Sequence, residues 1–165
     1  MIIIQEAIEV RLSHLRDARQ LMDLDALVWD EHTAPGPVQW TSREQYLNAC
    51  PPGSQIIAVM DTRVVGYVGF RAPTGLRSNA HVLEIHIAVH PAYQKQGIGS
   101  MLMDSVKELA REQQVRKLRL RVLSHNRRAL AFYQKCGFIE EGRLLNEFCI
   151  GGKYVDDILM RYLLK

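Results

Sequence analysis

The stretch that best indicates the fold of this chain is a glycine-rich run, Gln94-Lys95-Gln96-Gly97-Ile98-Gly99-Ser100. The residues before it, 82–89, alternate apolar and polar side chains, which predicts a β-strand. After the run, apolar side chains recur at helical spacing from Leu102 to Ala110, which predicts an amphipathic helix of about four turns. The run therefore joins a strand directly to the N-terminus of a helix.

A helix N-terminus placed in this way is suited to bind an anion. Its first backbone N–H groups have no partner within the helix, and the positive end of the helix dipole lies there. Gly97 and Gly99 lack the Cβ atoms that would keep a phosphate at a distance, although the glycines could also serve only to make a tight corner. Two other phosphate motifs do not fit, because Leu102 replaces the third small residue of the Rossmann fingerprint and no Gly-Lys-Ser/Thr of a P-loop is present.

The rest of the chain predicts a mixed α/β (α+β) fold. Strands are predicted at 2–4, 56–60, 64–70, 82–89, 118–122, 145–150 and 154–163. Helices are predicted between Ser13 and Trp29, between Ser42 and Pro51, after Gly99, and between Asn126 and Gly137. Hairpins alternate with two helical crossovers, so the sheet must contain both parallel and antiparallel strands, in the order β-α-α-β-β-β-α-β-α-β-β.

Composition places these elements in one domain, residues 1–165. The chain is 47% hydrophobic and 24% charged, which suits a single substantial core. No run is long enough to span a bilayer, and polar Gln5 and Glu6 follow Met1-Ile2-Ile3-Ile4 at once, so we expect a cytoplasmic protein without a membrane partner. The net charge of +3 is too small to indicate nucleic-acid binding but suits a small polyanionic ligand.

Three sequence blocks resemble the GNAT (Gcn5-related N-acetyltransferase) superfamily. Gln94-Lys95-Gln96-Gly97-Ile98-Gly99 matches its Gln/Arg-x-x-Gly-x-Gly/Ala cofactor motif, and the blocks 87–93 and 126–138 flank it in the family's order. The similarity is close from Leu83 to Phe138, and the tail is similar to the hairpin that ends many members. The resemblance implies a single-domain GNAT fold, a mixed central sheet flanked by helices, that transfers an acetyl group from acetyl-CoA to a primary amine by direct transfer in a ternary complex.

The resemblance also assigns roles to residues. The backbone of Ile87, Ala88 and Val89 would pair with the pantetheine arm, and the Val89 N–H would polarise the thioester carbonyl. Tyr133 matches the position whose phenol protonates the departing thiolate, although it could serve packing alone. The implied cofactor-binding residues are Ile87, Ala88, Val89, Gln94, Lys95, Gln96, Gly97, Ile98, Gly99, Ser100, Asn126 and Tyr133. Asn126 could equally be a plain helix cap.

The base that removes a proton from the amine is less defined by sequence. Glu84 on the strand before the glycine run is the first candidate, although the relatives' position could fall on Leu83 if the strand bulges. His86 on the same face is the second candidate. We expect no metal, because His81 points to the face opposite His86 in a regular strand. Cys136 lacks an activating partner, which favours direct transfer over an acyl-cysteine.

The acceptor is not defined by these motifs. Loop 30–40 and segment 143–148 are predicted to shape its pocket, and Asp30, Glu31 and Glu147 could attract a cationic amine. Small amines, amino acids, antibiotics and protein N-termini all remain open as acceptors. The rival interpretation is a catalytically silent acyl-CoA-binding regulatory module. A homodimer formed through the C-terminal strands is a further prediction, because exposed sheet edges favour pairing.

Overall fold

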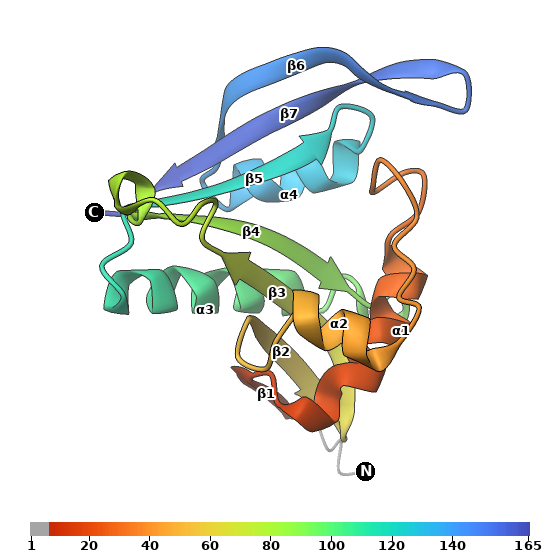
Figure 1. Ribbon diagram of the computed structural model, residues 1–165, viewed down its shortest axis with the longest axis vertical. Helices are drawn as coiled ribbons and strands as arrows, with labels where there is room; N and C mark the ends of the chain where they lie inside the picture. The colour runs from red at the N-terminus through yellow and green to blue at the C-terminus, as the bar shows by residue number, and fades with distance from the viewer. Residues whose placement is uncertain (1–6) are drawn as a thin grey trace, which may run out of the picture.

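The computed structural model describes residues 7–165 as a seven-stranded sheet with helices on both faces (Figure 1). The strand order is β1-β2-β3-β4-β5-β7-β6. The elements are β1 (Ile8–Leu12), α1 (Ala18–Val28), α2 (Arg43–Ala49), β2 (Gln55–Met60), β3 (Arg63–Arg71), β4 (Val82–Val89), α3 (Ile98–Glu112), β5 (Lys117–Leu123), α4 (Arg127–Lys135), β6 (Ile139–Ile150) and β7 (Lys153–Leu163). Within the described residues, no helix has the length and apolar character needed to cross a membrane.

The predicted order of elements and the mixed sheet are confirmed. β4 and β5 run parallel, and the other neighbouring strands run antiparallel. The strand predicted at 2–4 lies outside the described residues, and the first described strand is β1 at Ile8–Leu12. β6 begins at Ile139, well before the predicted Leu145, because its mostly exposed, polar first half carries no clear alternation.

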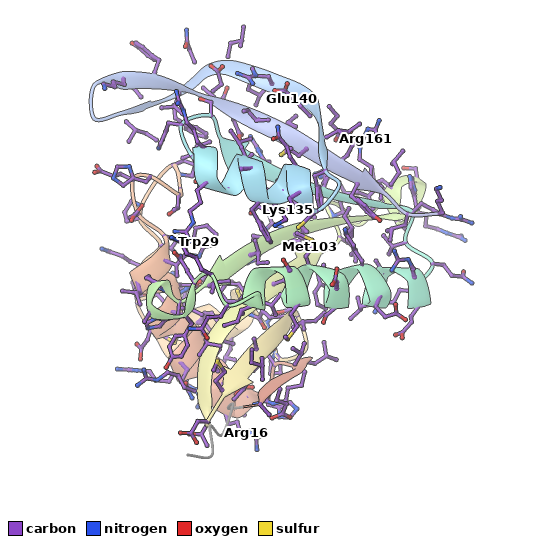
Figure 2. All side chains as sticks on the ribbon, turned by 180° about the vertical axis from the view of Figure 1, so that it is seen from behind. Arg16, Trp29, Met103, Lys135, Glu140 and Arg161 are labelled. Carbon is purple, nitrogen blue, oxygen red and sulfur yellow. The ribbon has the colours of Figure 1, made fainter. Side chains whose placement is uncertain are left out.

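Two apolar clusters lie on opposite faces of the sheet. Leu102 of α3 and Val68 of β3 belong to the larger cluster, on the side seen in Figure 2, where α3 and α4 cover the sheet. Leu21 of α1, Tyr46 of α2 and Tyr67 of β3 belong to the smaller cluster, on the side seen in Figure 1. Val68 and Tyr67 are neighbours in sequence, so the alternation of one strand supplies both cores.

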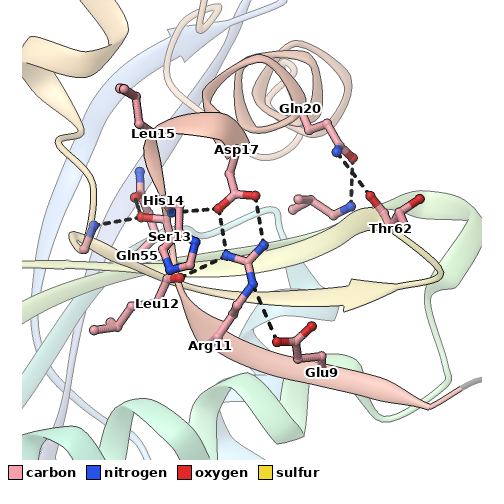
Figure 3. A network of polar contacts seen from close by, with 12 residues as sticks. Glu9, Arg11, Leu12, Ser13, His14, Leu15, Asp17, Gln20, Gln55 and Thr62 are labelled. Carbon is pink, nitrogen blue, oxygen red and sulfur yellow. Dashed lines mark hydrogen bonds and ion pairs between the residues drawn. The ribbon is translucent and has the colours of Figure 1, made fainter.

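A polar network fixes the start of α1 against the sheet (Figure 3). The Arg11 guanidinium donates to both carboxylate oxygens of Asp17, at 2.8 and 3.0 Å, and the His14 N–H donates to the same carboxylate at 2.7 Å. The Ser13 hydroxyl donates to the Gln55 side-chain oxygen at 2.6 Å. Burial acts to raise the pKa of Asp17, but the hydrogen bonds from Arg11 and His14 outweigh it and leave the pKa below its usual value.

β4 and β5 separate after a short stretch of pairing. Their register covers only 82–84 against 117–119, although β4 continues to Val89. On its other edge β4 pairs with β3 without a register shift as far as Val89. In the described part of the chain, one edge of the second half of β4 therefore has no partner strand, and a gap opens in the middle of the sheet.

Candidate active site

A cavity of about 520 Å³ occupies this gap between β4 and β5. Its walls come from the end of α1, from β4, from the glycine-rich run, from β5 and from α4. Every residue predicted to bind the cofactor lines this cavity except Gln96. Figure 2 shows Trp29, which also lines the cavity, beside the C-terminal end of β4. The structure thus brings together residues that are up to about a hundred positions apart in sequence.

The glycine-rich run forms the predicted helix start. Gly97 is the N-cap of α3 with φ of +79°, a left-handed conformation that favours glycine. A Cβ atom at Gly99 would lie 3.1 Å from the Phe132 ring, so Gly99 allows α4 to approach α3 closely. Among residues 7–165, no side chain caps the N-terminus of α3. Its first N–H groups are therefore available to an anion in the cavity.

The backbone of β4 presents donors to the same cavity. The His90 N–H donates to the Val65 carbonyl of β3 at 2.8 Å. Because successive N–H groups of a strand point to opposite edges, the N–H groups of Val89 and Ile87 point away from β3, into the gap. A carbonyl oxygen placed in the cavity can accept a hydrogen bond from Val89.

Tyr133 on α4 lies on the other side of the gap. Its side chain is 8% exposed and lines the cavity, and its ring packs near Phe132 and Phe138. Within residues 7–165 the Tyr133 hydroxyl makes no hydrogen bond. Desolvation raises the pKa of Tyr133 above its ordinary value, so the phenol stays protonated at neutral pH. A protonated hydroxyl without a protein partner can donate to a group bound in the cavity.

His86 lines the cavity from the face of the sheet that lies opposite α3 and α4. Its ring lies over Gly69, the cross-strand partner on β3, and contacts Tyr67 edge-on at 5.5 Å between centroids. Among the described residues neither ring nitrogen has a hydrogen-bond partner. Desolvation lowers the pKa of His86, although the nearby charge of Asp25 opposes the shift. The imidazole is therefore neutral near pH 7 and can accept a proton.

The buried carboxylate of Asp25, which sequence reasoning missed, binds three aromatic side chains near His86. Asp25 accepts hydrogen bonds from the indole nitrogens of Trp29 at 3.0 Å and Trp40 at 2.8 Å, and from the Tyr67 hydroxyl. Only 4% of Asp25 is exposed. An acidic residue four positions before Trp29, on a predicted helix otherwise patterned for burial, is the signal that could have identified it.

Glu84, the first candidate for the base, is not brought into the cavity. It lies five residues before Val89, or about 16 Å along the strand. Arg71 and Arg119 pair with its carboxylate at 3.2 and 3.0 Å. Burial acts to raise the pKa of Glu84, but the hydrogen bonds from Arg119 and Arg71 outweigh it and leave the pKa lowered. Glu84 is thus held by two arginines outside the cavity, and its role as the base stays a prediction.

The remaining predicted residues differ in whether they line the cavity. Thr33 is the only lining residue from loop 30–40 among those described, and segment 143–148 contributes none. Asn126 does cap α4, accepting a hydrogen bond from the Ala129 N–H at 3.2 Å, and it also lines the cavity. Desolvation raises the pKa of the Cys136 thiol, which disfavours a thiolate. The described residues contain no group of ligands that could hold a metal ion.

Comparison with known proteins agrees with this geometry. The model of the acetyltransferase (GNAT) family matches residues 21–138. A solved protein from Streptococcus mutans UA159 superimposes with a TM-score of 0.88 at 28% identity, and the match covers 95% of this chain and 99% of the Streptococcus protein. A Salmonella typhimurium protein described as an acetyltransferase and solved with acetyl-CoA shares the fold, with a TM-score of 0.83 at 16% identity over 96% of this chain and 95% of that protein.

Curated relatives carry acetyltransferase names. A spermidine N(1)-acetyltransferase of Vibrio cholerae is 32% identical over 83 residues, which is 50% of this chain and only about half (47%) of that protein. A Bacillus subtilis protein assigned as a ribosomal protein bS18 alanine N-acetyltransferase is 27% identical over 146 residues, or 87% of this chain and 89% of its own. With its family match across most of its length, the chain belongs to the GNAT family of acetyl-CoA-dependent N-acetyltransferases.

Proposed function

We propose that this protein, a single domain spanning residues 1–165, transfers an acetyl group from acetyl-CoA directly to a primary amine in a ternary complex. The observation that carries the proposal is the gap between β4 and β5, where free backbone donors, a protonated phenol and a neutral imidazole line one cavity. Direct transfer is supported because Cys136 does not line the cavity and because the raised pKa of its thiol disfavours a thiolate.

The charges of this cavity and the open edge of β4 support acetyl-CoA as its ligand. The uncapped N-terminus of α3, from Gly97 to Ser100, offers N–H groups to the pyrophosphate, next to Gln94, Lys95 and Gln96 in the glycine-rich run. Lys95, Arg128 and Lys135 line the cavity, and none of them forms an ion pair within residues 7–165. The edge of β4 would pair with the pantetheine arm as an added strand does.

The proposed chemistry requires two proton transfers. The amine nitrogen attacks the thioester carbon while the Val89 N–H stabilises the oxygen anion that forms. His86 takes the proton that the amine loses, in place of Glu84. The C–S bond then breaks, and Tyr133 donates its proton to the sulfur. Solvent later returns a proton to Tyr133 and removes one from His86, so the enzyme ends in its starting state.

Release of CoA, measured with a thiol reagent, tests the proposal. Wild type and Tyr133→Phe are assayed with acetyl-CoA against polyamines, amino acids, aminoglycosides and N-terminal peptides. Tyr154→Phe, exposed on β7, is the matched control. We expect amine-dependent release that falls about 10²-fold in Tyr133→Phe only. Tight acetyl-CoA binding without turnover would instead support the regulatory acyl-CoA-binding module.

A cytoplasmic location and a homodimer through β6 and β7 belong to the same proposal.

A further inference from the structure

Arg121 lines the cavity from the same face of the sheet as His86, the proposed base. Its neighbours Leu120 and Val122 are buried in the cluster under α3 and α4, so Arg121 projects from the other face of β5. On β4, Ile85 belongs to that cluster and His86 projects from the other face. Both Arg121 and His86 line the cavity. The arginine therefore faces the space where the amine meets the base.

A buried carboxylate holds this guanidinium by one edge. Arg121 Nε donates to Asp157 Oδ2 at 2.7 Å, and a second guanidinium nitrogen contacts the same oxygen. Asp157 is 3% exposed, whereas about half of the Arg121 side chain (51%) is exposed. Within residues 7–165, the Nη1 group of Arg121 makes no hydrogen bond. A positioned guanidinium with free N–H groups on one edge is suited to bind a carboxylate.

The charges of the cavity favour an acidic acceptor. Its lining residues, within the described part of the chain, include no carboxylate. Lys95 lies on the glycine-rich run, where the pyrophosphate is proposed to bind, and Arg128 and Lys135 lie on α4, which covers the other face of the sheet. Arg121 is therefore the lining cation on the same face as His86. The nearby Asp25 is buried and already accepts three hydrogen bonds. A polyamine would find no carboxylate among these lining residues to pair with its ammonium groups.

We propose that Arg121 binds a carboxylate of the acceptor, so that the substrate is a small amine that also carries an acid group, as an amino acid does. The amine then lies near His86 and the carboxylate near Arg121. This inference rests on the proposed acetyl transfer and names its substrate class.

The test compares acids with their uncharged amides. CoA release is measured for glycine, β-alanine, γ-aminobutyrate and larger α-amino acids, for the amide of each, and for spermidine. Arg121→Gln removes the charge, and Arg121→Lys keeps it. Arg119→Gln is the matched control, because Arg119 lies on the same strand and face, is ion-paired with Glu84 and does not line the cavity. Thermal melts check that every variant folds.

We expect wild type to use an acid at least about 10-fold better than its amide. Arg121→Gln should lower kcat/KM for the acid about 10- to 100-fold and change it less than about threefold for the amide. Arg121→Lys should retain part of the preference, and Arg119→Gln should retain all of it. Equal use of acids and amides, a preference for spermidine, or an equal loss on both substrates in Arg121→Gln would overturn the inference while leaving acetyl transfer intact. No release with any acceptor would overturn both.

Discussion

Gly69→Ala is expected to disable the enzyme without unfolding it. A Cβ atom at Gly69 would lie 2.5 Å from His86 Nε2 and 2.9 Å from His86 Nδ1. Ordinary carbon contacts begin near about 3.5 Å, so the imidazole must move by about 1 Å or rotate off β3. The ring ends a flexible side chain, and therefore the ring rather than the backbone should yield.

The size of the effect follows from this displacement. A misplacement of about 1 Å can cost about 10²-fold in rate, and a general base contributes about 10²- to 10⁴-fold. We therefore expect kcat of Gly69→Ala to fall about 100-fold, measured as CoA release at saturating acceptor. The Kd for acetyl-CoA should change less than about twofold, because Gly69 does not line the cavity.

The control is Gly142→Ala on β6, where the new Cβ would meet Leu159 at an ordinary 3.4 Å. This variant should keep full activity. In wild type, activity should rise with pH as His86 loses its proton, with a midpoint below the usual histidine value of about 6.5, since the pKa of His86 is lowered. If Gly69→Ala keeps kcat within twofold of wild type, His86 is not the base and the reasoning fails.

The remaining predictions concern stability and cofactor binding. Asp17→Asn should lower the free energy of unfolding by about 1.5–3 kcal/mol at pH 7 in urea titrations. Because the pKa of Asp17 is lowered in the fold, its contribution should be present above the unfolded pKa of about 4 and should fade in wild type as the pH falls through the folded pKa. Phe138→Ala empties a site that is 1% exposed and should cost about 3–5 kcal/mol in the same titration. Gly99→Ala should raise the Kd for acetyl-CoA about tenfold in calorimetry, since its Cβ would press on Phe132, with little change in melting temperature.

Local signals in the sequence were sufficient for most of the fold. The glycine-rich run, with its following helix, and the alternation at 82–89 each specify their own structure, and the structure has both. β1 was not predicted, because five residues with mixed burial carry little pattern. The cofactor side of the site is similarly local, since the run and the end of β4 are adjacent in the chain.

The acceptor side depends on contacts that no local pattern encodes. Glu84 and His86 share a face and differ by two positions, and the sequence alone favoured Glu84. The two residues have different surroundings for two reasons. β4 stops pairing with β5 at Glu84, and Arg71 and Arg119 come from the two neighbouring strands to pair with the Glu84 carboxylate. Asp157 reaches Arg121 across the sheet in the same way. Pairing between distant segments therefore decides which side chains line the cavity.

The most direct test of the central claim is amide hydrogen exchange with and without acetyl-CoA. The free edge of β4 and the N-terminus of α3 are the proposed contacts of the cofactor. We expect acetyl-CoA to slow exchange at the amides of Ile87 and Val89 and at residues 97–100, while the amides of β6 remain unchanged. Protection confined to other parts of the chain, or no protection at saturating acetyl-CoA, would contradict the account.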